Sequence, residues 1–577
     1  EKIGRHPENP AAQARWYGHV DELIKEVDAT RPVFIHSGGQ SCDVETNNLY
    51  LNFMALQERE DFPSAWSDRG EKPWGVVEHG PPYVGSFFKR HTPLFTEYFA
   101  MYLGDRAYRL ETDDYVRLCE EAVKRPWKGH RSFTVLELAH LGEMSAFYEF
   151  MDLFIRNTNR AWRGWGVNIG WFPWLSMVGY GVPPELPKKF RSFTYTELTE
   201  GQARALRTTP PAWANPLYHA YRDTMQPLLV FIGGPPERFT AKDHAFFAGE
   251  EFLKTIVAVW DGPGRARLDA SWRLETDGKV IASGTESFEL TPGAIERRPI
   301  RLMAPDVARR TDATLHLEVT GVDMKAPMSD AALVTFWPSP DTSSPSVKSK
   351  WGLFDPREES EPSLRQLGLK LRSVRGRESL EAQGIDVLVI GRAALSGAGK
   401  LPFTKGDLEQ GLRVLMLEQN VDALASLGLR TQDVVSRYVF IRDESHASLS
   451  CLEAADLCNW RGEGTLLPGT SAGMKQWPHP HARHWGNYGS VASVVIEVPH
   501  RGAFTPLLDC EFDLAYSPLL EWRHGEGGIV FCQLDLTGRV GLEPAATRLA
   551  HDLVACLDKP FDETQNRRVV YAGSEDG

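Results

Sequence analysis

The sequence predicts a multidomain protein in which two α/β regions flank an antiparallel β-sandwich. Strands alternate with helical segments up to residue 214 and again after residue 351, a pattern typical of parallel α/β architecture. Between these regions, short alternating stretches recur at regular spacing, as in an immunoglobulin-like sandwich. The chain of 577 residues is also too long for one domain, given roughly 150 residues per domain.

The first region, residues 1–214, begins with an amphipathic helix. Apolar side chains at helical spacing predict this helix over 11–28, and Asn9-Pro10 supplies its start signal. Short apolar runs predict four strands, and two further segments have helical spacing. The strands are expected at 33–35, 49–53, 74–77 and 167–172, and the helices at 93–103 and 133–160.

The second region, residues 215–340, predicts strands separated by turns that contain Gly or Pro. They are expected at 255–260, 266–274, 279–283, 298–303, 314–319 and 332–337. Ser and Pro then dominate the chain and cannot support a packed core, so residues 341–350 are predicted to be a linker.

The third region, residues 351–565, alternates strands and helices again and predicts a doubly wound α/β domain. Its strands are expected at 386–391, 413–417, 494–496 and 529–532, followed by a helix over 544–557. Residues 566–577 are expected to be a tail.

The composition of the chain limits the kinds of partner and ligand that we expect it to bind. A net charge of −13 repels phosphate backbones, so we expect no nucleic acid partner. The longest apolar runs are far shorter than the ~20 residues that cross a bilayer, so we expect no membrane partner. The seven cysteines include no CxxC pair, and His479, His481 and His484 lie in a Pro-interrupted stretch typical of a surface loop. The sequence therefore predicts neither a metal site nor a cofactor.

Glu78 is the sharpest candidate for chemistry. It directly follows the apolar run Trp74-Gly-Val-Val77, and Gly80 with two prolines then turns the chain. A carboxylate at the C-terminal end of a parallel strand faces the side on which α/β barrels build their active sites. The alternative is a strand-end glutamate that pairs with Arg31 or Lys72.

Four segments together resemble the catalytic barrel of glycoside hydrolase family 2, which includes β-galactosidases, β-glucuronidases and β-mannosidases. They are Asp28-Ala-Thr-Arg-Pro-Val33, Tyr50-Leu-Asn-Phe53, Lys72-Pro-Trp-Gly-Val-Val-Glu-His-Gly80 and Gly170-Trp-Phe-Pro-Trp174. The resemblance covers about the first 180 residues. It implies the C-terminal half of a (β/α)8 TIM barrel, with its fifth to eighth strands present and the N-terminal half as a missing partner segment.

The resemblance also implies a retaining mechanism with two carboxyl groups. It makes Glu78 the nucleophile, at the end of the seventh barrel strand. The acid/base in this family is a glutamate that ends the fourth strand, and Glu1 stands 77 residues before Glu78, at a compatible spacing. Two alternatives stay open: Glu1 is an ordinary terminal glutamate, or the acid lies on chain that precedes it.

Further positions are expected to bind substrate. Aromatic rings stack on the apolar face of a sugar, and a tyrosine near the sixth strand holds the nucleophile in the family. Arg31 is expected to support the base of the site, and polar residues after the first predicted strand to reach sugar hydroxyls. The expected substrate-binding residues are Trp174, Trp66, Tyr50, Asn52, His36, Asp43 and Arg31.

The third region resembles a class I glutamine amidotransferase-like domain of the type appended to some β-galactosidases for oligomerisation. An active domain needs a cysteine after a central strand, whereas Glu418-Gln419 follows residues 413–417 and Cys532 lies inside a strand. We therefore expect it to be inactive and to mediate homo-oligomer assembly.

The leading hypothesis is an exo-acting retaining β-glycosidase that acts on an oligosaccharide, polysaccharide or glycoside, in the periplasm or outside the cell rather than in the cytoplasm. The alternative is a non-catalytic carbohydrate-binding or scaffolding protein that keeps a glycosidase-like fold.

Overall fold

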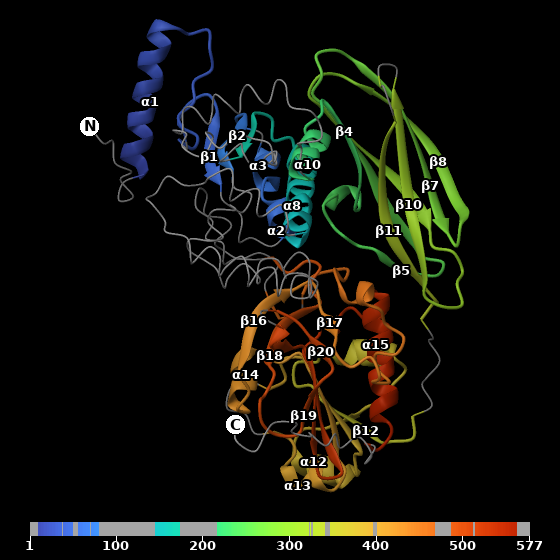
Figure 1. Cartoon of the computed structure of the whole chain (residues 1–577). Coiled ribbons are helices and arrows are strands. Elements are labelled where there is room, and N and C mark those ends of the chain that lie inside the picture. The colour runs from blue at the N-terminus through green and yellow to red at the C-terminus, as the bar shows by residue number, and fades with distance from the viewer. Residues whose placement is uncertain are drawn as a thin grey trace, which may run out of the picture. The chain divides into compact units, whose positions relative to one another are not determined.

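The computed structural model describes residues 10–36, 38–49, 56–69, 71–79, 145–173, 216–321, 324, 327–340, 347–395, 401–464, 466–467, 486–511 and 514–561 (Figure 1). The chain forms two compact units. Unit 1 comprises residues 1–339, 468–489 and 511–513, and unit 2 comprises residues 340–467, 490–510 and 514–577.

Unit 1 opens with a small α/β part. Three parallel strands form a sheet in the order β1-β2-β3: β1 (Glu45–Leu49), β2 (Trp74–His79) and β3 (Gly170–Pro173). The helices are α1 (Pro10–Val27), α2 (Leu56–Asp61), α3 (Ser64–Arg69), α8 (Ser145–Gly164) and α10 (Pro216–Thr224). The predicted helix at 11–28 and the predicted strand at 74–77 are confirmed.

The predicted strand at 33–35 is wrong, because other partners take the backbone groups that a ladder would use. Val33 N donates to the Asp43 carboxylate at 2.7 Å, and Asp43 N donates back to Val33 O at 3.1 Å. Ile35 O accepts from Gly38 N and from the Thr46 hydroxyl. The strand that pairs with β2 is β1, which ends at Leu49, the first residue of the strand expected at 49–53.

Other predictions for this region are confirmed only in part. β3 begins at Gly170 rather than 167, and α8 covers the second half of the helix expected at 133–160. Residues 50–53, the expected helix at 93–103 and residues 133–144 lie outside the described residues.

A cluster of large aromatic side chains forms the core of the α/β part. The Trp74 ring lies 5.5 Å from that of Trp66, 5.8 Å from that of Trp162 and 6.1 Å from that of Phe62. Its indole N–H donates to Asn47 Oδ1 at 2.7 Å, which satisfies the polar atom of a fully buried ring. This cluster joins β2 to helix α8.

The rest of unit 1 is a two-sheet β-sandwich. One sheet has the order β5-β11-β10-β7-β8 and the other the order β4-β6-β9. All six predicted strands are confirmed, and most are longer than expected; β4 and β5 were not predicted as sandwich strands. The strands are β4 (Leu228–Gly233), β5 (Ala245–Phe247), β6 (Glu251–Trp260), β7 (Ala266–Thr276), β8 (Lys279–Leu290), β9 (Ala294–Met303), β10 (Thr311–Gly321) and β11 (Met328–Trp337).

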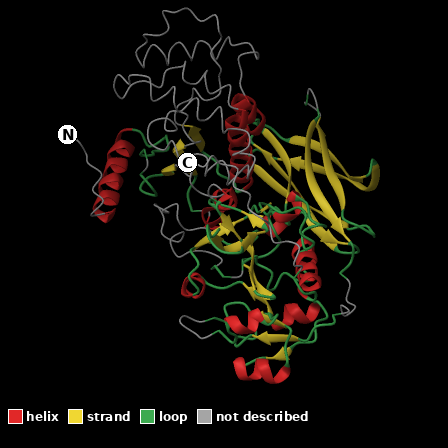
Figure 2. Cartoon of the chain, turned by 60° about the horizontal axis from the view of Figure 1, so that its bottom comes forward, coloured by secondary structure: helices red, strands yellow, loops and turns green. Residues whose placement is uncertain are grey.

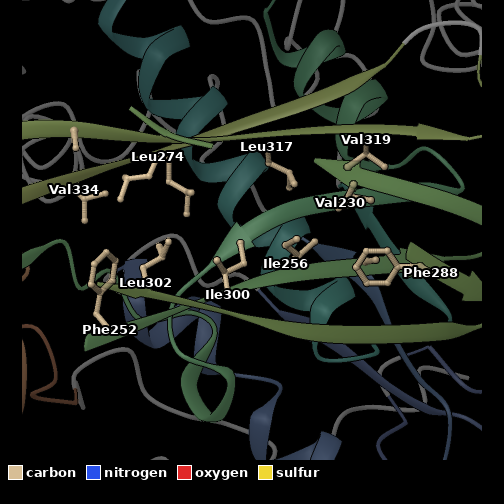
Figure 3. Packing of buried hydrophobic residues seen from close by; sticks show 14 of the residues in the cluster. Val230, Phe252, Ile256, Leu274, Phe288, Ile300, Leu302, Leu317, Val319 and Val334 are labelled. Carbon is tan, nitrogen blue, oxygen red and sulfur yellow. The ribbon is translucent and has the colours of Figure 1, made fainter. Parts of the chain in front are cut away.

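Alternating apolar residues of the two sheets meet in one core (Figure 3). Leu274 and Leu317 come from the five-stranded sheet, and Ile300 and Leu302 from the three-stranded sheet. Leu274 is fully buried, and its neighbours are nearly so. The sandwich is therefore held together by apolar burial between its layers.

Unit 2 is built on a seven-stranded sheet with the order β13-β12-β14-β15-β23-β22-β19, flanked by helices (Figure 2). The first five of these strands are parallel, and β22 and β19 are antiparallel to their neighbours. The strands are β12 (Trp351–Phe354), β13 (Arg372–Ser373), β14 (Val387–Ile390), β15 (Arg413–Leu417), β19 (Phe504–Pro506), β22 (Leu519–His524) and β23 (Gly527–Cys532). The helices are α11 (Glu361–Gln366), α12 (Arg377–Gln383), α13 (Lys405–Glu409), α14 (Val421–Ser426) and α15 (Pro544–Leu557).

Two small antiparallel sheets complete unit 2: β16 (Thr431–Ser436), β18 (Ala492–Glu497) and β21 (Tyr516–Ser517), and then β17 (Phe440–Ile441) and β20 (Leu508–Asp509). The predicted strands at 386–391, 413–417 and 529–532 and the helix at 544–557 are confirmed. The strand expected at 494–496 exists as β18, but it belongs to a small sheet rather than to the main one.

Glu418 turns the chain sharply at the end of the central strand β15. Its φ of 22° is uncommon for a residue other than glycine. The side chain is fully buried, and Thr537 donates to its carboxylate from both N–H (2.7 Å) and hydroxyl (2.6 Å). Burial raises the pKa of Glu418 to about 7, although the two bonds from Thr537 oppose the shift.

We expect Glu418→Gln to make the protein more stable than the parent above pH 7. The folded parent holds a proton on Glu418 that the unfolded chain releases near pH 4.5, so its unfolding free energy falls as pH rises from about 4.5 to 7. Glutamine mimics the protonated acid and does not titrate. Urea denaturation should give similar stabilities at pH 5 and a gain on the order of 2 kcal/mol at pH 8.

A matched control is Glu361→Gln, since Glu361 is a partly exposed carboxylate paired with Arg365 in the same unit. This control should follow the parent at both pH values. Equal stabilities of Glu418→Gln and the parent at pH 8 would contradict the prediction.

Candidate functional site

Glu78 lies one residue before the C-terminal end of β2, at the same end as the other two parallel strands finish. The adjacent His79 ring contacts Phe154 and Trp162 of helix α8, with centroids 6.0 and 5.2 Å away. Because successive side chains of a strand point to opposite faces, Glu78 points to the face that α8 does not cover. In a βα barrel this is the inner face.

His36 and Glu78, both predicted from the sequence, come together in the structure. The Nε2 atom of His36 lies 3.1 Å from Glu78 Oε1, and the side chain of Glu78 is 20% exposed. The histidine is 52% exposed, so the pair borders solvent rather than the core. The carboxylate is thus both oriented and accessible.

Asn48 completes this group from β1, where it is paired in register with Glu78. Its Nδ2 lies 3.0 Å from the same Nε2 of His36. One ring nitrogen cannot accept from Asn48 and donate to Glu78 at once. The tautomer with its hydrogen on Nε2 donates to the carboxylate, and it requires the Asn48 amide to be turned over so that Oδ1 rather than Nδ2 faces the ring.

Asp43 and Arg31 lie in local contacts away from Glu78. Asp43 accepts from Val33 N and pairs with Lys25 at 2.6 Å, and the hydrogen bond from Lys25 is the main reason that its pKa is lowered. Arg31 is 83% exposed and pairs with Asp28, three residues earlier. These contacts fasten helix α1 to the following coil, so the structure gives no support to a substrate-binding role for either residue.

Trp66 lies in the aromatic core rather than on a surface that a sugar reaches. It is only 8% exposed, its ring lies against Trp74, and its indole N–H donates to Lys72 O at 3.0 Å. A ring buried on this scale offers no free face for stacking, and this explains why the expected sugar-platform role is not supported.

The other expected site residues, Glu1, Tyr50, Asn52 and Trp174, lie outside the described residues. No group of His, Cys, Asp and Glu side chains suited to holding a metal ion occurs within the described ranges. Within the same ranges, no helix is both long and apolar enough to cross a membrane.

Sequence reasoning missed Asn48 and His79. His79 is buried against α8, and burial lowers its pKa to about 3, so it is neutral and serves the packing of β2. Its position beside Glu78 was the available signal. Asn48 carried no such signal, because only strand pairing brings it to the site.

In unit 2, the sequence predicts that no reactive thiol is present, either on the turn after β15 or at Cys532. Glu418 occupies the turn after β15, and Cys532 is the last residue of β23. That thiol is fully buried, and burial raises its pKa, which keeps it in the unreactive neutral form.

No protein-family model and no curated protein matches the chain. Solved structures give slight likenesses. Native alpha-2-macroglobulin of E. coli is 15% identical (TM-score 0.15) over 20% of this chain and 7% of that chain. Red sea bream transglutaminase is 11% identical (TM-score 0.15) over 24% and 21%. A family 123 glycoside hydrolase from Clostridium perfringens is 9% identical (TM-score 0.17) over 35% and 60%. Likenesses this slight carry no argument about the fold or the activity.

Proposed function

We propose that the protein is an exo-acting retaining β-glycosidase that hydrolyses terminal non-reducing sugars in the manner of a β-galactosidase. The observation that carries the proposal is the position of Glu78. It is a solvent-accessible carboxylate at the C-terminal end of the middle strand of a parallel sheet, on the face opposite α8, with His36 at 3.1 Å. Carboxylates at this end of parallel strands are where α/β barrels perform catalysis.

In the proposed double displacement, a Glu78 oxygen attacks the anomeric carbon and the glycosidic C–O bond breaks. A second carboxylic acid gives its proton to the leaving oxygen. Water, deprotonated by the same second group, then cleaves the glycosyl ester and releases the sugar with retained configuration. His36 is assigned a positioning role, since its N–H holds Glu78 Oε1 while the other oxygen attacks.

The proposal also assigns a fold class to each part of the chain. β1, β2 and β3 are assigned to a (β/α)8 barrel of family 2 type, with Glu1 as the candidate acid/base. The sandwich is assigned to the immunoglobulin-like class, and unit 2 to an inactive amidotransferase-like domain that mediates homo-oligomer assembly. A periplasmic or secreted location is proposed with them.

The test is to trap the glycosyl–enzyme ester with 2-deoxy-2-fluoro-β-glycosyl fluorides of galactose, glucose, mannose and glucuronic acid. The fluorine slows breakdown of a covalent intermediate, which a retaining enzyme forms on its nucleophile. We expect one of these reagents to label the peptide that contains Glu78, as read by mass spectrometry.

Label on another carboxylate would remove Glu78 from the role of nucleophile. Sugar binding with neither label nor turnover would support the alternative of a non-catalytic carbohydrate-binding protein.

A further inference from the structure

A cavity of about 200 Å³ lies within unit 1, where helix α8 meets the end of β4, the loop 234–244 and β11. Neither Glu78 nor His36 is among the described residues that line it. Its charged lining consists of Glu60, Arg160, Lys242, Asp243, His244 and Lys254. Leu333, which is 74% exposed, also lines the cavity and places its mouth at the protein surface.

Two successive glycines build one wall of this cavity. A Cβ on Gly233 would lie 2.7 Å from Phe239 O, and a Cβ on Gly234 would lie 2.5 Å from Ala241 O. No side chain fits at either position, so the loop passes directly against the end of β4. The rings of Phe231 and Phe239 supply an apolar part of the lining. The cavity thus combines a fixed backbone wall with aromatic and charged side chains.

Two of the cations that line the cavity are neutralised by ion pairs. Lys242 Nζ lies 2.6 Å from Glu60 Oε2, and Arg160 Nη2 lies 3.0 Å from Asp330 Oδ1. The positive charge of each of these two side chains is therefore balanced by the negative charge of its own carboxylate.

The third cation, Lys254, and the second lining carboxylate, Asp243, are hydrogen-bonded to uncharged groups instead. Lys254 is almost completely buried, and its ammonium donates to Asp243 O. The Asp243 carboxylate accepts from Tyr488 Oη at 2.9 Å, a residue of the same unit. The lining thus carries three cations and two carboxylates, and Asp330, which pairs with Arg160 from outside the lining, is the third carboxylate. Counted together with Asp330, the lysine, arginine and carboxylate charges around the cavity balance.

Two polar atoms of the lining side chains have no hydrogen-bond partner within the described part of the chain. They are Glu60 Oε1, an acceptor on a side chain that is 5% exposed, and Arg160 Nε, a donor. A buried polar atom without a partner costs free energy that a bound group with the opposite function recovers. A ligand for this cavity must therefore both donate and accept hydrogen bonds.

We propose that this cavity binds a neutral sugar ring of monosaccharide size. Its hydroxyls donate to Glu60 Oε1 and accept from Arg160 Nε. The volume suits one such ring, since a cavity of roughly 150 Å³ holds benzene and one water occupies roughly 30 Å³. The matched charges exclude a ligand recognised mainly by its ionic charge.

The test measures binding of D-galactose, D-glucose and inorganic phosphate to the full chain, by titration calorimetry and saturation-transfer NMR. We expect one of the sugars to bind and phosphate not to bind. Glu60→Gln removes the charged acceptor and should raise the dissociation constant for the sugar at least about tenfold. Glu58→Gln is the matched control, because Glu58 is a buried carboxylate of the same helix that does not line the cavity.

A second variant tests the site without removing a buried group. Leu333→Trp narrows the mouth at an exposed position and should weaken sugar binding at least about tenfold. Val280→Trp, at an exposed sandwich position outside the cavity, should leave binding unchanged.

Three results would overturn the proposal. The first is no sugar binding, which would indicate a cavity filled by water. The second is binding of phosphate in place of sugar. The third is sugar binding that survives Leu333→Trp and is lost in Glu78→Gln, which would assign it to the Glu78 site. Loss of hydrolysis in Glu78→Gln with binding retained would leave this proposal standing, so the two proposals fail separately.

Discussion

Glu78→Gln is expected to lower kcat for aryl β-glycoside hydrolysis by on the order of 10⁴-fold or more, while the fold is retained. The amide has nearly the same shape as the carboxylate but cannot form the glycosyl ester, and removal of a group that acts covalently costs losses of this size. The side chain is partly exposed, so its exchange leaves no buried charge behind. Steady-state kinetics on the aryl glycosides, with circular dichroism as the folding check, measure the effect.

Two further variants sharpen this experiment. His36→Gln keeps a donor near Glu78 and His36→Ala removes it, so the alanine variant should lose roughly 10²-fold and the glutamine variant less. Arg31→Gln, an exposed change away from the pair, should leave turnover unchanged. Full activity of Glu78→Gln would eliminate the proposed mechanism.

Trp74→Ala is expected to destabilise unit 1 by about 3–5 kcal/mol, the range for truncating a buried tryptophan. The ring is fully buried between Trp66 and Trp162, and its removal also leaves the buried Asn47 amide without its 2.7 Å partner. Urea denaturation followed by near-UV circular dichroism reports this loss.

The matched control is Trp16→Ala on helix α1, where the ring is 50% exposed and truncation should change stability by less than about 0.5 kcal/mol. Equal effects of the two variants would show that the aromatic core contributes little to stability. Because Trp74 and Glu78 share strand β2, loss of the core should also reduce turnover.

The local sequence pattern was sufficient to predict most of the helices and strands. Helical spacing located α1 and α15 to within a residue or two, and alternation located the six sandwich strands. Their patterns repeat over many residues, so each element carries its own signal. The run at 33–35 was too short for this, and the hydrogen bonds from Val33 N to the Asp43 carboxylate and from the Thr46 hydroxyl to Ile35 O decided its conformation.

The candidate site divides in the same way. The sequence alone marked Glu78, because an apolar run ends at a carboxylate, and it marked His36 as a polar residue that follows the strand predicted at 33–35. It could not show that Trp66 is buried, because a tryptophan looks the same in the sequence whether its ring is buried or exposed.

By itself the sequence determined the order of α/β, sandwich and α/β segments and the placement of Glu78 at a strand end. Only the tertiary structure decided that His36, 42 residues away in the chain, lies 3.1 Å from Glu78, and that α8, β4 and β11 enclose a cavity. The physical reason is the separation along the chain over which each kind of interaction acts. Periodicity and turn chemistry act over a few residues, whereas a site is made by packing and strand pairing between segments that are far apart in the chain.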